Sequence, residues 1–156
     1  MPVRWISVRP GFIPLWDDDE ADIEDWSVDE LDKPDELVEV LRILLGGADP
    51  AALAEFDRLH NDGWRQSPPQ WTGERLRRFS AVTGRVPDPR GPVEGYWELA
   101  DATVADLAPK LPWTQRYVGR PVEEVRRSIR LEWLGAYGLH QFLADAVAGG
   151  NEVVAD

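Results

Sequence analysis

The chain has 156 residues, an apolar fraction of 43% and a net charge of −12, values typical of one folded domain rather than a disordered chain. It contains no cysteine, which excludes disulfides, thiolate metal sites and cysteine nucleophiles. No apolar run approaches the roughly 20 residues of a membrane-spanning helix, and the acidic charge repels nucleic-acid phosphates and anionic membranes.

The first predicted element is a short strand over residues 3–8, where β-branched and aromatic residues stop at Pro10 and Gly11. Its best partner in the sequence is residues 93–99, whose side chains alternate between two faces. A helix over 92–107 competes for that segment, but Gly95 is costly inside a helix. We therefore predict one small two-stranded pair.

An acidic loop is predicted next, over residues 17–33. Residues 1–40 hold 13 acidic and 3 basic residues, a net charge of −10, so nearly all of the imbalance lies there. A calcium loop of the EF-hand type starting at Asp17 would need glycine at its sixth position and glutamate at its twelfth, where Asp22 and Val28 stand. The sequence therefore predicts no metal site in this loop.

Five helices follow, recognised by proline or a capping residue at their starts and glycine at their ends. Gly46 and Gly47 are expected to end the first, and Gly63 the second. The last is the longest and carries an apolar stripe. The predicted helices cover about residues 34–45, 50–63, 73–83, 104–111 and 121–149.

These elements predict a mainly α protein of the α+β class, with the strand pair attached, in a single domain over residues 1–156. The N-terminus lacks the long apolar region of a signal peptide. We therefore expect a soluble cytoplasmic protein.

The segment "VRPGFIPLWDDDE…SVDELDKPDELVEVLR", residues 8–42, resembles the opening of short uncharacterised actinobacterial proteins. In these an Arg-Pro-Gly stretch leads to Leu-Trp-Asp, an acidic gap and a Pro-x-Glu-Leu helix. Such proteins are similar to small immunity proteins encoded beside toxins. The resemblance implies a protein-binding role and assigns no site residue.

The acidic run has three interpretations: a solvated loop, a loop paired with the chain's own arginines, or a surface for a basic partner. Large aromatic residues beside the acids favour the partner surface, because interfaces are enriched in them, although each tryptophan could instead pin the loop to the core. The leading hypothesis is a non-enzymatic protein of immunity or antitoxin type that binds a basic protein. Its predicted partner-binding residues are Trp16, Asp17, Asp18, Asp19, Glu20, Asp22 and Trp26.

No zinc-binding HExxH, P-loop, nucleophile elbow or dinucleotide fingerprint occurs. The sequence therefore predicts no cofactor and no catalytic residue.

The rival hypothesis is a small-molecule binder or enzyme with a pocket between the longest helix and the arginine-rich middle segment. A homo-oligomer formed through that helix is a third alternative. The predicted lining of the pocket is Tyr117, Arg120, Arg127, Trp133, Tyr137 and His140.

Two further tryptophans, Trp64 and Trp71, lie in a proline-bearing loop, where partner contact and core packing are both open.

Overall fold

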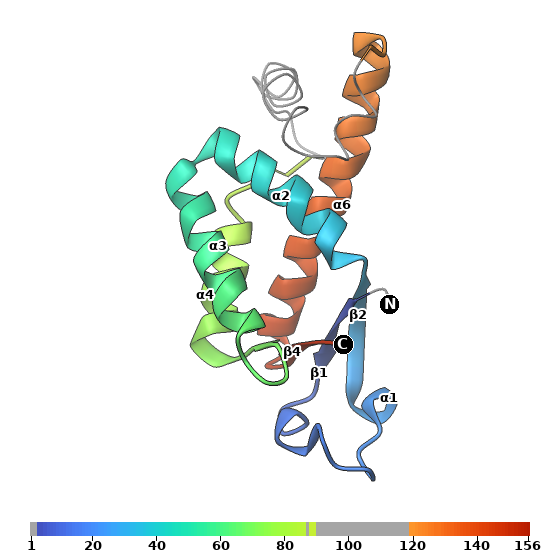
Figure 1. Ribbon diagram of the computed structural model, residues 1–156, viewed down its shortest axis with the longest axis vertical. Coiled ribbons are helices and arrows are strands. Elements are labelled where there is room, and N and C mark those ends of the chain that lie inside the picture. The colour runs from blue at the N-terminus through green and yellow to red at the C-terminus, as the bar shows by residue number, and fades with distance from the viewer. Residues whose placement is uncertain (1–2, 87, 90–118) are drawn as a thin grey trace.

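The structure is a computed structural model that describes residues 3–86, 88–89 and 119–156. A four-stranded antiparallel sheet joins its elements in the order β2-β1-β4-β3 (Figure 1). The strands are β1 (Arg4–Val8), β2 (Ser27–Asp32), β3 (Gln70–Trp71) and β4 (Glu152–Ala155). β1 pairs with β2 on one side and with β4 on the other, so Trp5 lies opposite both Leu31 and Ala155.

The expectation of a single strand pair is therefore wrong, because the sheet has four strands. The strand predicted at 3–8 is confirmed, but both of its sides are occupied by β2 and β4. The expected partner, residues 93–99, and the helix predicted around 104–111 lie outside the described residues.

The helices of the described ranges comprise a short 3₁₀ turn and five α-helices, four of which are long enough to build a core. They are η1 (Ile13–Leu15), α1 (Ile23–Trp26), α2 (Pro34–Ala48), α3 (Pro50–Trp64), α4 (Gly73–Thr83) and α6 (Val122–Ala148). None of these helices combines the length and the apolar character that crossing a membrane requires.

The bounds of the long helices follow their capping residues closely. Asp49 accepts hydrogen bonds from the backbone N–H groups of Ala51 and Ala52 and so caps α3. One expectation fails: α2 continues through Gly46 and Gly47 to Ala48. A Cβ on Gly46 would lie 3.1 Å from Cδ2 of Leu53, so this glycine allows close packing of α3 rather than ending α2.

The main core lies between the sheet and the helices. Trp5 of β1 and Trp71 of β3 are fully buried there with Phe56 of α3 and Phe79 of α4. The four rings pack against one another; the centroids of Trp5 and Trp71, for example, are 4.8 Å apart. Leu139 of α6 is buried in the same cluster, so the long helix belongs to this core.

A second, smaller core lies on the opposite face of the sheet, because successive strand side chains alternate between faces. Its buried residues are Ile6, Val8, Phe12 and Val154. Residues 12–26 cover this face and pass below the sheet in Figure 1. The acidic loop predicted at 17–33 is thus only partly a loop, since residues 23–26 form α1 and residues 27–32 form β2.

Candidate partner-binding surface

The acidic segment, defined here as residues 16–26, is fixed to the sheet by an aromatic cluster centred on Phe12. The Phe12 ring is 2% exposed. It contacts Trp16 edge-on at a centroid distance of 5.6 Å and Trp26 at 5.8 Å. Both tryptophans are partly buried against the second core. They pin the segment to its own fold, and each keeps part of its ring exposed.

Local hydrogen bonds from the carboxylates shape the rest of the segment. Asp18 Oδ1 accepts from the backbone N–H of Glu20 at 2.9 Å. Asp22 Oδ1 accepts from the backbone N–H of Glu24 at 3.0 Å and caps α1. These bonds are typical of turns built by aspartate.

All seven carboxylates of the acidic segment are exposed. Within the described parts of the chain, none of them forms an ion pair. The residues are Asp17, Asp18, Asp19, Glu20, Asp22, Glu24 and Asp25. Their negative charge is therefore directed to solvent without a neutralising guanidinium.

Three arginines of the middle segment, Arg77, Arg78 and Arg85, pair with acids outside the acidic segment. Arg77 and Arg78 both pair with Glu74 on their own helix, α4. The hydrogen bond from Arg77 and its positive charge lower the pKa of Glu74. Arg85 pairs with Asp49 at 2.9 Å. These cations compensate charge on the helices and leave the acidic segment uncompensated.

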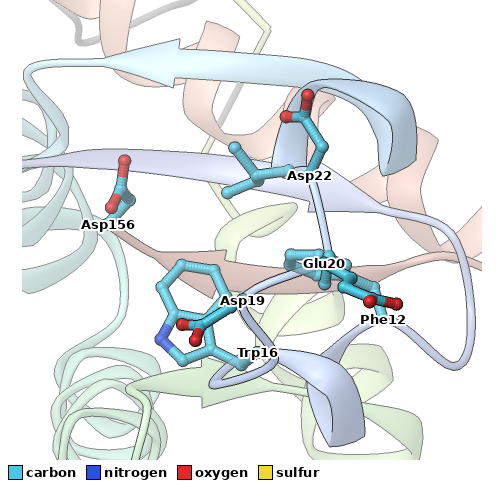
Figure 2. Close-up of a pocket in the computed structure, with 8 residues that line it drawn as sticks. Phe12, Trp16, Asp19, Glu20, Asp22 and Asp156 are labelled. Atoms are coloured by element: carbon cyan, nitrogen blue, oxygen red, sulfur yellow. The ribbon is translucent and has the colours of Figure 1, made fainter.

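A groove of about 580 Å³ opens beside the acidic segment (Figure 2). Its lining combines aromatic and aliphatic side chains with four carboxylates. The lining residues are Phe12, Trp16, Asp19, Glu20, Ala21, Asp22, Ile23 and Asp156. Asp156 is already paired with Arg4 at 3.0 Å. Carboxylates beside aromatic and aliphatic side chains suit the charged head and alkyl stem of lysine or arginine.

The described part of the chain holds no cluster of three or more histidine or acidic side chains arranged to bind a metal ion.

The described residues of the rival pocket lie along α6 or just before its start. Arg120 pairs with Glu124 at 2.9 Å, and Arg127 is exposed. Trp133 is 3% exposed and belongs to the main core. Tyr117 lies outside the described residues.

Tyr137 and His140 are brought together, with their rings 5.5 Å apart. His140 Nδ1 lies 2.8 Å from Thr83 Oγ1, and that hydroxyl donates to the carbonyl of Ser80. Since the hydroxyl has one proton, His140 Nδ1–H is the donor to Thr83. Burial lowers the pKa of His140, so the ring is a neutral link between α4 and α6.

An aromatic cluster around His60 was missed at the level of sequence. His60 Nε2 accepts from Trp64 Nε1 at 2.9 Å, and its ring stacks against Phe56 and Trp71. Trp71 is fully buried, so the core-packing interpretation of this residue is confirmed. With Trp5 and Phe79, which also meet the His60 ring, the cluster joins the four elements β1, α3, β3 and α4, and no local pattern signals such a meeting.

No protein-family model, curated protein or solved structure matches this chain significantly. The functional interpretation therefore depends on the surface itself.

Proposed function

We propose that this chain is a non-enzymatic protein-binding protein, of immunity or antitoxin type, whose acidic segment binds a basic protein partner. The observation that carries the proposal is that seven exposed carboxylates project from a segment anchored by Phe12 and remain unpaired within the described structure. A surface of this kind attracts a cationic partner over a distance and raises the rate of encounter.

The aromatic anchoring supports the proposal further. A solvated charge run is usually mobile, and ordering it on binding costs conformational entropy. Here Trp16 and Trp26 already hold the backbone against the second core. The carboxylates are consequently presented at fixed positions, and the exposed parts of the two rings add apolar contact area beside them.

Affinity capture from cells of the source organism tests this function. We compare wild type with an acid-neutralised variant carrying Asp17→Asn, Asp18→Asn, Asp19→Asn, Glu20→Gln and Asp22→Asn. A helix control variant removes the same number of exposed carboxylates from α3, α4 and α6. Its substitutions are Glu55→Gln, Glu74→Gln, Glu123→Gln, Glu124→Gln and Asp145→Asn.

We expect wild type and the helix control to retain a basic protein at low salt and to release it at high salt, because exposed charges are screened by salt. We expect the acid-neutralised variant to retain much less of it. Equal retention by both variants would contradict the proposed function.

A further inference from the structure

We propose that the free edge of β2 is a docking site for an extended, lysine- or arginine-bearing segment of the partner, which pairs antiparallel with β2 as a fifth strand. This inference rests on the proposed function and names the form of the basic partner. β2 is the terminal strand of the sheet, and Figure 1 shows it at the outer border beside β1. An edge strand presents unpaired backbone groups that another chain can use.

The register determines which backbone groups face outward. Arg4 exchanges both of its backbone hydrogen bonds with Asp156, so its N–H and C=O point toward β4. Because these groups alternate sides along a strand, those of Trp5 point toward β2 and meet Leu31. In β2 the backbone N–H and C=O of Glu30 therefore point away from β1. The backbone N–H of Asp32 does the same. These groups face the side that no strand of the described sheet occupies.

A hydrogen bond at Glu30 supports this assignment. Its backbone N–H donates to Asp29 Oδ1 at 2.9 Å. An N–H that pointed toward β1 would donate to a carbonyl of that strand instead. The Asp29 carboxylate thus covers the outward donor while the edge is free. An incoming strand would replace it with a carbonyl oxygen and release the carboxylate to a cation.

The charge of β2 decides which strand can dock. Asp29, Glu30 and Asp32 are all exposed, and like charges opposite one another across two strands destabilise the pair. A second copy of β2 would bring such charges together, so self-pairing is disfavoured. A strand with lysine or arginine opposite Glu30 and Asp32 would form favourable pairs instead. Arg4 already makes one such cross-strand contact, with Glu30 at 3.1 Å.

The faces of β2 also specify the pattern of the docking strand. Leu31 is partly buried against the main core, whereas Glu30 and Asp32 point to the other face. The incoming strand should therefore alternate, with basic residues opposite Glu30 and Asp32 and an apolar residue opposite Leu31. In an antiparallel pair, the backbone amides of those basic residues are the ones that donate to β2.

The test uses a capped seven-residue peptide of alternating lysine and valine, together with two N-methylated forms. One form carries methyl groups on the lysine amides and the other on the valine amides. We expect the parent peptide to bind at low salt and to slow hydrogen exchange at the amides of Glu30 and Asp32. We expect lysine-amide methylation to weaken binding about tenfold or more, because several backbone bonds are lost, and valine-amide methylation to change it little.

A matched pair of protein variants provides an independent check. Glu30→Pro removes the outward donor and Glu30→Gln keeps it, while both remove the same charge; proline is tolerated on an edge strand where its nitrogen faces outward. We expect Glu30→Pro to bind the peptide more weakly than Glu30→Gln, with the fold of each checked by circular dichroism.

The outcomes separate the docking edge from the proposed function. In one contrary result the peptide binds in a salt-sensitive way without slowing hydrogen exchange at the amides of Glu30 and Asp32; in another it still binds after lysine-amide methylation. Either result would overturn the docking edge and leave the acidic segment as the binding surface. Absence of any binding of the parent peptide at low salt would overturn the docking edge and count against the proposed function as well.

Discussion

At the scale of single residues, Gly63 shows how one position is fixed by a contact distant in sequence. A Cβ on Gly63 would overlap the indole nitrogen of Trp71, and that nitrogen donates to the carbonyl of Leu59 at 3.0 Å. Trp71 is fully buried and cannot move aside without disturbing the rings around it. Glycine at position 63 is therefore required by packing and not by backbone conformation.

We expect Gly63→Ala to lower the free energy of unfolding by about 3 kcal/mol, through overpacking and loss of the indole hydrogen bond. The matched control is Gly138→Ala on α6, where an added Cβ meets no described atom within 4 Å. Because alanine favours helix, the control should raise stability by up to about 1 kcal/mol. Urea unfolding measures both changes, and a tolerated Gly63→Ala would contradict the packing of Trp71.

The two histidines predict a pH dependence of stability. Burial lowers the pKa of both His60 and His140 in the folded protein. In the unfolded chain the histidine pKa is about 6.5, so as the pH falls the unfolded chain binds protons before the folded protein does. This proton uptake favours the unfolded state, and the free energy of unfolding therefore falls with the pH. Above about pH 7 both histidines are neutral in the folded and in the unfolded protein, so their protonation no longer lowers the free energy of unfolding there.

We expect urea unfolding of wild type to show a loss of stability from pH 7 to pH 5 that is smaller in the double variant His60→Gln, His140→Gln. The difference between the two slopes isolates the histidines from the carboxylates, which titrate lower. Parallel slopes in the two proteins would contradict the lowered pKa values.

At the scale of elements, the helices could be predicted because their signals are local. Pro34, Pro50 and Pro121 mark three starts, and Gly84 and Gly149 follow two ends. The chemistry of those few residues is independent of the rest of the fold. This is why the helix bounds from the sequence and from the structure agree closely.

The strands β2 and β4 could not be predicted in the same way. β2 contains Asp29, Glu30 and Asp32, and aspartate and glutamate are depleted in strands. It forms because β1 supplies a ladder partner and Arg4 pairs with Glu30. β4 has four residues and begins soon after the long helix α6 ends at Ala148, and four residues are too few for a periodic pattern. Both strands depend on partners distant in sequence.

The cap of α3 gives a prediction at this scale. Asp49→Ala removes the acceptor for Ala51 and Ala52 and should lower the free energy of unfolding by about 1 kcal/mol. Asp49→Asn keeps the cap and loses only the exposed ion pair with Arg85, so its effect should be clearly smaller. Urea unfolding at pH 7 compares them, and equal losses would assign the effect to the ion pair instead.

At the scale of the whole molecule, the sequence indicated where the charge lies but not how it is presented. The exposure of Asp17 to Asp25 follows from composition, since a carboxylate run resists burial. That Phe12 anchors the run to the far face of the sheet depends on a tertiary cluster with Trp16 and Trp26. The two tryptophans thus pin the run to the fold, as one of the two interpretations predicted, while contact with a partner stays a prediction.

The association rate constant with the captured partner, measured by stopped flow from low to high ionic strength, tests the central claim most directly. Because electrostatic attraction raises association rates by about 10- to 1,000-fold, we predict at least a tenfold slower rate for the acid-neutralised variant at low salt. The helix control should stay close to wild type, and all three rates should converge as salt is added. Equal rates for the acid-neutralised variant and wild type at low salt would contradict the claim.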